Sequence, residues 1–253
     1  MFKRTLLAAV SATLLISSFP SLAKTPTIDD KILRVGTDSS FAPFEFLSVE
    51  ENEFVGFDID MIKAIGKDLG YKVVVQNMGF DATIPALQSG IVDVVVAGMS
   101  ITEPRKKAIN FSDPYYTSGL IVLVQENNTT IKSIDDLVGK KIGVQIGTTG
   151  MFKAEKIPGA TVVNFANASE TFLEFDNGGV EAVIQDYPVV AYYLSQNKKG
   201  KMVGEKMDAE DYGIAIKKGN DELTAQINKS LAKIKANGEY ARIYKKWFGT
   251  EPK

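Results

Sequence analysis

The chain has 253 residues, of which 45% are hydrophobic and 24% are charged, with a formal net charge of −2. These values are typical of a globular protein of one or two domains, and without a basic surplus we expect no nucleic-acid partner. The absence of cysteine and histidine excludes disulfides, lipid attachment to an N-terminal cysteine, histidine-based catalysis and the usual zinc ligands, so we expect no catalytic residue, metal or cofactor.

The first element in the chain is a predicted signal peptide. Lys3 and Arg4 form a basic start, residues 6–16 are mostly apolar, and residues 21–23 (Ser-Leu-Ala) offer the small side chains that a signal peptidase requires. The apolar run is too short to span a bilayer. We expect cleavage after Ala23. Because no cysteine can carry a lipid anchor, we also expect the mature protein in the periplasm of a bacterium with two membranes.

Short apolar runs then alternate with helical spacing. The elements expected in this part are strands at 32–36, 73–75 and 92–97, with helices over 62–69 and 84–87. The strands are continuously apolar rather than alternating, as in a parallel sheet that helices cover on both faces. This part of the chain therefore predicts an α/β fold.

The pattern starts again in the second half. Strands are expected at 119–124, 141–146, 161–164, 180–185 and 213–216, and helices after 148, over 169–175, over 223–234 and in a last amphipathic stretch that ends at 247–248. Residues 87–95 and 175–183 share a pattern of helix end, glycine, valine and acid before a strand, which favours two similar lobes.

The predicted domain division follows from this repeat. Lobe 1 is discontinuous, with residues 24–114 plus 213–253, and lobe 2 spans 120–207. Hinge segments are expected near 115–119 and 208–212. Two crossings between lobes allow closure but restrict other relative motion.

The predicted strands end in segments rich in glycine, serine, threonine and aspartate, and in open α/β sheets ligands bind beyond the carboxyl ends of the strands. The planar guanidinium of Arg105 can bind a carboxylate through two parallel hydrogen bonds, and Ser100 could bind the same carboxylate. Asp186, which follows a strand of the other lobe, could pair with an ammonium group. A carboxylate site and an ammonium site together favour an α-amino acid as the ligand.

Four further residues complete the candidate site. Asp38 and Gln145 follow strands and could contact a polar side chain, while Phe41 and Phe80 could cover an aliphatic stem. Each of the seven residues alone is a weak signal, since such residues are often caps, turn residues or core. Their common place at strand ends is what supports the site.

The chain contains a series of short motifs: Gly-Thr-Asp at 36–38, Phe-Ala-Pro-Phe-Glu at 41–45, Gly-Phe-Asp-Ile-Asp at 56–60, Ile-Pro-Ala-Leu-Gln at 84–88, Arg-Lys-Lys-Ala at 105–108, Phe-Ser-Asp-Pro-Tyr-Tyr at 111–116, Gly-Thr at 147–148, and Ile-Tyr-Lys-Lys-Trp-Phe-Gly at 243–249. In this order they resemble the polar amino acid family of periplasmic solute-binding proteins that serve ABC importers, with most similarity to its glutamine binders. They cover nearly the whole mature chain.

The resemblance implies a type II two-lobe fold with two hinge strands, closing over one free L-amino acid, and an inner-membrane ABC permease as partner of a monomer. It implies that Arg105 and Ser100 take the α-carboxylate, and that Asp186 and the Gly98 carbonyl take the α-ammonium. It also implies side-chain contacts from Phe41, Phe80 and Asp38, and places Thr148 and Thr149 at the cleft.

The sequence departs from the glutamine binders at two positions. Gln145 stands where they have a lysine and Gln185 where they have a histidine, and Gln145 before Gly-Thr-Thr is similar to binders of histidine, lysine and arginine. We favour glutamine, because one carboxylate, Asp38, faces the side chain and a buried guanidinium needs more compensation. A basic amino acid is the alternative.

Two other classes of function are weighed against a binding protein. Some relatives on this fold are dehydratases of cyclic carboxylates, which need a carboxyl group with a raised pKa over the pocket. Asp38 and Asp186 are the candidates for that role, and both are better used as partners of the ligand. A receptor's ligand-binding module would need adjoining transmembrane segments.

Overall fold

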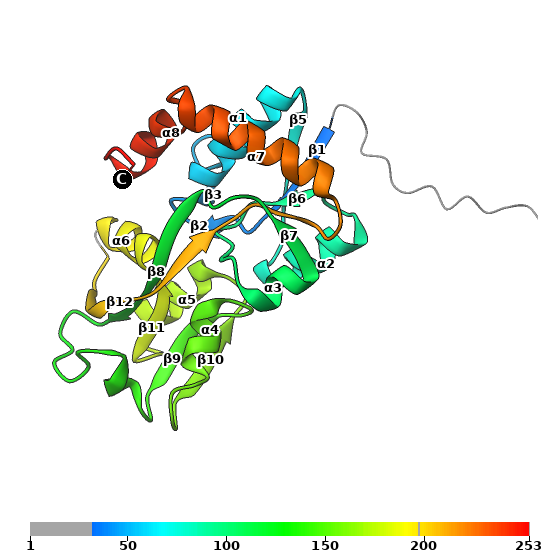
Figure 1. Ribbon diagram of the computed structural model, residues 1–253. Helices are drawn as coiled ribbons and strands as arrows, with labels where there is room; N and C mark the ends of the chain where they lie inside the picture. The colour runs from blue at the N-terminus through cyan, green and yellow to red at the C-terminus, as the bar shows by residue number, and fades with distance from the viewer. Residues whose placement is uncertain (1–31, 197, 253) are drawn as a thin grey trace, which may run out of the picture.

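The computed structural model describes residues 32–196 and 198–252, so the predicted signal peptide lies outside the described residues. Two five-stranded sheets, each with its own helices, form two lobes that lie one above the other in Figure 1. This arrangement confirms the predicted two-lobe α/β fold. Among the described residues, no helix combines the length and apolar character that crossing a membrane requires.

The first sheet contains the early strands of the chain and one late strand. Its order is β5 (Lys72–Asn77), β1 (Ile32–Thr37), β6 (Val94–Val95), β13 (Ala215–Lys217) and β7 (Ile109–Phe111). β13 runs against the other strands, which share one direction. The predicted strand at 92–97 shortens to the two residues of β6, because the chain turns at both of its ends.

The second sheet repeats this order with a different set of strands. It runs β10 (Thr161–Phe165), β9 (Lys141–Gln145), β11 (Ala182–Asp186), β8 (Tyr116–Val124) and β12 (Lys201–Tyr212). Here β8 is the strand that runs against the others. In each sheet three neighbouring strands pair in parallel, and the first of these in the chain, β1 or β9, lies between the other two, so the two lobes present corresponding strand ends to each other.

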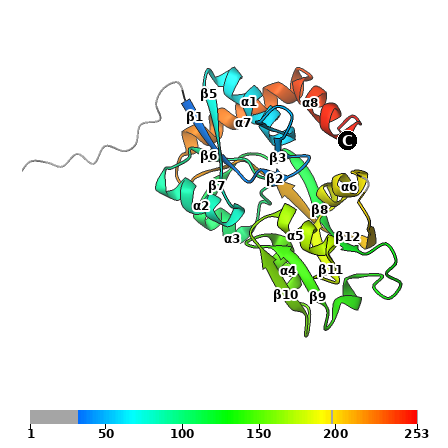
Figure 2. The same ribbon diagram turned by 180° about the vertical axis from the view of Figure 1, so that it is seen from behind.

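Helices cover the two sheets. Those of the first lobe are α1 (Phe57–Leu69), α2 (Phe80–Ser89), α3 (Glu103–Ala108), α7 (Asp221–Ala236) and α8 (Glu239–Phe248). Those of the second are α4 (Thr149–Ala154), α5 (Ala168–Asp176), α6 (Tyr187–Ser195) and a short 3₁₀ helix at Ile134–Leu137. Figures 1 and 2 show α1, α7 and α8 gathered at the end of the molecule away from the second sheet.

A small third sheet was not predicted. It consists of β2 (Ser40–Phe41), β3 (Glu45–Ser48) and β4 (Glu53–Val55), with Asn52 in the left-handed region at φ 52° between the last two. These strands are too short to show a clear period. Their importance is that they place Phe41 and Glu45 beside the end of β1.

The strands β8 and β12 connect the lobes. They pair antiparallel as far as Tyr116 and Tyr212, and Tyr212 also bridges to Ser100 beyond the first sheet. The ring of Tyr212 stacks on that of Tyr116 at 5.7 Å. The two segments expected to form the hinge therefore contain paired β-structure next to the loops that follow β6.

Candidate functional site

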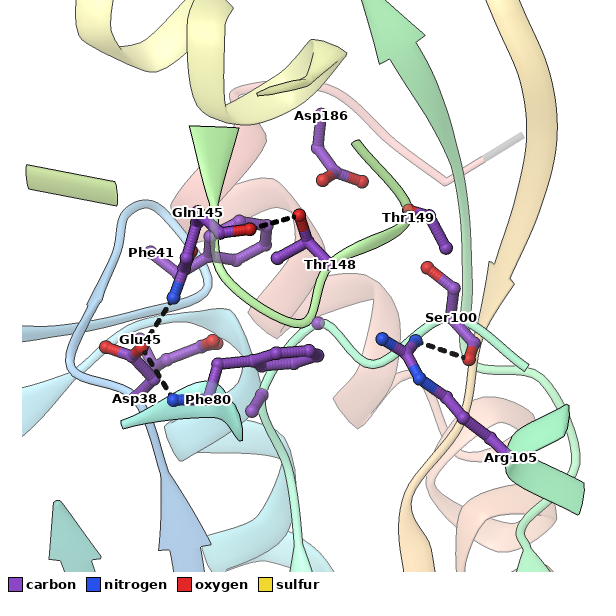
Figure 3. Close-up of a pocket in the computed structure, with 12 residues that line it drawn as sticks. Asp38, Phe41, Glu45, Phe80, Ser100, Arg105, Gln145, Thr148, Thr149 and Asp186 are labelled. Atoms are coloured by element: carbon purple, nitrogen blue, oxygen red, sulfur yellow. Dashed lines mark hydrogen bonds between the residues drawn. The ribbon is translucent and has the colours of Figure 1, made fainter. Parts of the chain in front are cut away.

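A cavity lies between the strand ends of the two lobes (Figure 3), with an empty volume of about 320 Å³ that includes its opening to solvent. All ten predicted site residues line it. They are Asp38, Phe41, Phe80, Gly98, Ser100, Arg105, Gln145, Thr148, Thr149 and Asp186. Glu45 and Ala97 also line it and were not predicted. The structure thus brings the predicted residues together, while their roles in binding remain predictions.

Local structure explains why these side chains meet. Asp38 follows β1, Gln145 ends β9 and Asp186 ends β11, so each projects from the carboxyl edge of its sheet. Arg105 comes from the first turn of α3, where Thr102 caps the helix by accepting from the Arg105 N–H at 3.4 Å. Corresponding edges of two similar sheets therefore form the two walls of the cavity.

Arg105 is buried and fixed by carbonyl groups from both lobes. Its Nη1 donates to the Ser100 carbonyl at 2.9 Å, and its Nη2 donates to the Gly147 carbonyl at 3.0 Å. The guanidinium lies 5.1 Å from the centre of the Phe80 ring. Burial lowers the pKa of Arg105, while Glu210 and Asp186 oppose that shift. A guanidinium has five N–H donors, so three stay available for a ligand carboxylate.

Asp186 is the carboxylate on the facing wall. The Tyr212 hydroxyl donates to its Oδ1, as does Ser118 Oγ at 3.1 Å. Burial raises the pKa of Asp186 to about 7, with the negative charge of Glu210 adding to the shift and these hydrogen bonds opposing it. Gln185 does not line the cavity, and its Oε1 accepts from the Asp186 N–H at 2.9 Å.

Asp38 and Gln145 meet at the other end of the cavity (Figure 3). Gln145 Nε2 donates to Asp38 Oδ2 at 2.7 Å, and Asp38 also accepts from Ser40 Oγ at 2.8 Å and from the Phe80 N–H at 3.2 Å. Burial raises the pKa of Asp38, and these three hydrogen bonds oppose the rise. With its amide nitrogen turned to Asp38, Gln145 keeps its carbonyl oxygen available as an acceptor.

Glu45 is the main residue that the sequence analysis missed. It is fully buried, and within the described part of the chain neither carboxyl oxygen has a hydrogen-bond partner. Burial raises its pKa well above the usual value, and the nearby charges of Asp58 and Asp38 add to the rise. The available signal was a glutamate within the apolar run Phe41–Leu47, where a charged residue needs a reason.

Gly98 allows the close packing of one wall. Its φ is 51°, and a Cβ at this position would lie 2.5 Å from Cε1 of Phe41. Because only a glycine accommodates both the backbone conformation and the aromatic ring, the Phe41 ring can press against the loop after β6.

Glu210, on β12, is a second residue that was not predicted. Its Oε2 accepts from Ser100 Oγ at 2.6 Å and from Thr149 Oγ1 at 2.8 Å, which joins a hydroxyl of each wall. Each hydroxyl has a single proton. A ligand carboxylate that takes either proton therefore competes with Glu210.

The sequence profile of the bacterial extracellular solute-binding proteins, family 3, matches residues 33–250. The chain belongs to this family. That finding confirms the family predicted from the motifs. Among the residues that the structure describes, no group of three or more acidic, histidine or cysteine side chains could hold a metal ion.

One Escherichia coli protein and two structures of ancestral arginine-binding proteins are among the similar proteins. A putative ABC transporter arginine-binding protein 2 of Escherichia coli is 38% identical over 97% of this chain and 99% of its own length. An ancestral arginine-binding protein bound to arginine is 50% identical, covers 86% of this chain and 98% of its own, and superposes with a TM-score of 0.84. An ancestral arginine-binding protein bound to glutamine is 49% identical, covers 87% of this chain and 98% of its own, and has a TM-score of 0.81.

A third solved structure is an ancestral amino acid-binding protein described as a precursor of cyclohexadienyl dehydratase. It is 42% identical, covers 86% of this chain and 95% of its own, and has a TM-score of 0.81. Binding proteins and an enzyme lineage thus share this fold.

Proposed function

We propose that the protein is the periplasmic binding component of an amino acid ABC importer and that it binds a free basic L-amino acid, arginine foremost. The observation that carries the choice of side chain is Glu45, a buried carboxyl that lines the cavity without a hydrogen-bond partner among the described residues. The preference for glutamine rested on a single carboxylate at this end. Glu45 adds a second carboxyl group that can ionise when a cation binds, and this reverses the ranking.

The backbone end of the ligand has the partners that an α-amino acid requires. The free N–H groups of Arg105 suit the α-carboxylate, and Asp186 suits the α-ammonium. Ser100 and Thr149 lie between them. The positive and the negative group come from different lobes, so a zwitterion gains both contacts when the lobes are closed.

The side-chain end offers mainly acceptors. Asp38 already accepts three hydrogen bonds, whereas Glu45 accepts none from the described residues. Gln145 adds a free carbonyl oxygen because its nitrogen faces Asp38. A guanidinium supplies only donors and a positive charge, so it matches this end better than a neutral amide does. Phe41 and Phe80 line the space between the two ends and suit an aliphatic stem.

Calorimetry with arginine, lysine, histidine, glutamine and glutamate tests the proposal. We expect arginine to bind at least about tenfold more tightly than glutamine, a difference of about 1.4 kcal/mol, and glutamate to bind most weakly because two acids face its side chain. Glu45→Gln should lower the affinity for arginine and leave that for glutamine nearly unchanged. Tightest binding of glutamate would overturn the assignment of this end.

Glutamine is the second candidate. The second N–H of Gln145 could donate to a glutamine carbonyl, and Asp38 could accept from its amide. Structures of ancestral arginine-binding proteins bound to arginine and to glutamine support the view that cavities of this kind take either ligand. Equal or tighter binding of glutamine in the same titrations would select this alternative.

The remaining features of the proposal concern the whole protein. We propose lobe 1 as residues 24–114 plus 213–253, lobe 2 as residues 120–207, and a monomer that delivers its ligand to an inner-membrane permease. The precursor would be cleaved after Ala23, which N-terminal sequencing of exported protein tests.

We further propose that the protein is not an enzyme. Turnover of a cyclic carboxylate such as prephenate would contradict that.

A further inference from the structure

Two fully buried carboxyl groups, those of Glu45 and Asp58, are neighbours near the side-chain end of the cavity. The Asp58 N–H donates to the carbonyl of Phe44, the residue before Glu45, at 2.9 Å, and the charge of Asp58 acts on Glu45. Glu45, on β3, lines the cavity, while Asp58, in the first turn of α1, does not. Asp58 Oδ2 accepts from the Gly98 N–H at 3.0 Å and from the Tyr115 hydroxyl at 2.7 Å. Within residues 32–196 and 198–252, Asp58 Oδ1 and both Glu45 oxygens have no partner.

Two ionised carboxylates cannot satisfy each other, since both are acceptors only. One proton supplies the missing donor, because a protonated Glu45 can donate a hydrogen bond to the free oxygen of Asp58. The charges that face Glu45 make ionisation of both groups costly, since Asp58, Asp38 and Asp186 are all acidic. Burial raises the pKa of Asp58 to about 6, against the hydrogen bonds from Gly98 and Tyr115. Such a pair titrates as a unit.

We propose that Glu45 and Asp58 share one proton in the empty site, and that the ligand side chain decides whether this proton stays. A guanidinium needs two ionised acceptors, so the proton leaves to the solvent when arginine binds. A neutral amide brings no positive charge to compensate a second carboxylate, so the proton stays between Glu45 and Asp58 when glutamine binds. Asp58 is then a positioning residue for specificity that lies outside the cavity. This inference rests on the proposed function.

The proton count of binding tests it. Calorimetry of each ligand in two buffers with different ionisation enthalpies, at about pH 7.5, gives the number of protons released. Asp186 contributes equally to both ligands, because both carry the same α-ammonium, so it cancels in the difference. We expect arginine to release up to about one proton more than glutamine. The ratio of arginine to glutamine affinity should then rise with pH, by at most about tenfold per pH unit.

Variants separate this role from a structural one. Glu45→Gln removes the acid that loses the proton. Asp58→Asn removes the partner that shares it, while an asparagine can still accept from Gly98 and Tyr115. Both should abolish the difference in proton release. Asp60→Asn is the matched control, because it removes an acid from the same first turn of α1 that lies outside the cavity and pairs with Lys246 and Trp247, and the difference should persist.

The outcomes are distinct. If arginine and glutamine both bind and release the same number of protons, the shared proton is wrong and the proposed function stands. If neither ligand binds, the proposed function fails and this inference falls with it. A difference that survives in both Glu45→Gln and Asp58→Asn would also overturn the assignment to this pair.

Discussion

Arg105 and Asp186 show how single residues are prepared for a zwitterion. Arg105 is positioned by two backbone carbonyls, and Asp186 by the hydroxyls of Tyr212 and Ser118. Neither depends on the other for a hydrogen bond. With the lobes together, as in this structure, both side chains are already oriented, so little conformational entropy remains to be lost on contact with the ligand.

Removal of either charge should weaken binding strongly. Arg105→Ala and Asp186→Asn each leave one ligand charge buried without its partner, which typically costs about 2–5 kcal/mol, or roughly 30-fold to several thousand-fold in affinity. Calorimetry with arginine measures the loss, and circular dichroism of the empty protein shows whether the fold is intact. Affinities within about threefold of wild type for both variants would refute the clamp.

The buried acids also predict how stability depends on pH. The pKa values of Asp58 and Asp186 in the folded protein, about 6 and about 7, are above their ordinary value. The folded state therefore binds more protons than the unfolded state in the window from about pH 4 to 7, and stability falls as pH rises through it. We expect the empty protein to melt at a higher temperature at pH 5 than at pH 8. Asp186→Asn should reduce this dependence, and a wild-type curve that rises with pH would contradict it.

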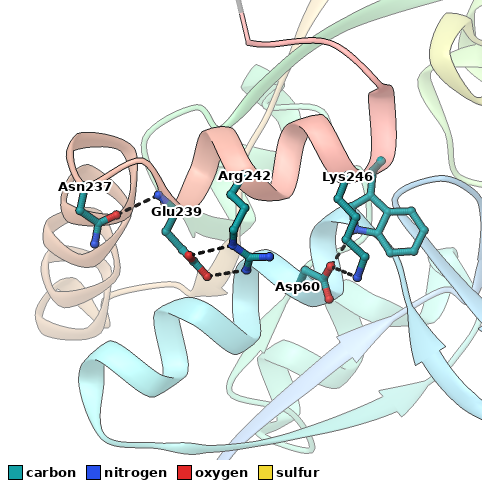
Figure 4. Close-up of polar contacts among 6 residues, drawn as sticks. Asp60, Asn237, Glu239, Arg242 and Lys246 are labelled. Atoms are coloured by element: carbon teal, nitrogen blue, oxygen red, sulfur yellow. Dashed lines mark hydrogen bonds and ion pairs between the residues drawn. The ribbon is translucent and has the colours of Figure 1, made fainter.

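At the scale of elements, an ion pair and a hydrogen bond connect α8 to α1 (Figure 4). Asp60 Oδ2, in the first turn of α1, accepts from Lys246 Nζ at 2.7 Å and from Trp247 Nε1 at 2.8 Å. Phe248 at the end of α8 packs against Phe44 and Phe57, with ring centres 5.5 and 5.2 Å away. The last helix thus supports the small sheet that carries Phe41 and Glu45, at a distance from the ligand.

Weakening this attachment should change stability rather than binding. Trp247→Phe keeps most of the ring but removes the N–H that Asp60 accepts, for which we expect a loss of about 0.5–1.5 kcal/mol in unfolding free energy. Arg242→Ala is a matched control on the same helix, because its pair with Glu239 is exposed and should be worth about 0.5 kcal/mol or less. Denaturant titration measures both. A tenfold change in arginine affinity in Trp247→Phe would show that α8 acts on the site.

At the scale of the whole molecule, contacts cross the cavity from lobe to lobe. Three hydrogen bonds are examples. Gln145 donates to Asp38, Arg105 donates to the Gly147 carbonyl, and the Ala168 N–H donates to Ser40 Oγ at 3.2 Å. A zwitterion that touches Arg105 on one wall and Asp186 on the other adds to them. A ligand shifts the equilibrium between open and closed forms only through such differential contacts.

Small-angle scattering should detect this shift. We expect the radius of gyration to fall when arginine is added to saturation, and to stay constant with aspartate, whose side chain Asp38 and Glu45 repel. Asp186→Asn at an equal arginine concentration should close less, since it lacks the ammonium partner on its wall. An unchanged radius for wild type at saturation would argue against a hinge.

Much of this organisation could be read from the sequence, because it depends on short-range patterns. Apolar runs and helical spacing located most strands and helices. The rule that parallel strands end at one edge selected seven candidate residues, and the family resemblance added Gly98, Thr148 and Thr149; all ten line one cavity. The motifs identified the family. The short strands β2 to β4 were not predicted, and β6 is shorter than the strand predicted at 92–97. The pairing of such short strands depends on distant partners rather than on local periodicity.

The tertiary structure alone decided what faces the ligand side chain. Glu45 and Asp58 are 13 positions apart on a strand and a helix, and Glu210 lies far from Ser100 and Thr149 in the chain. A charged residue is expected at the surface, and only packing of separate segments reveals that it is buried without a partner. The class of ligand was therefore accessible from the sequence, whereas the preference among side chains depends on electrostatics that folding creates.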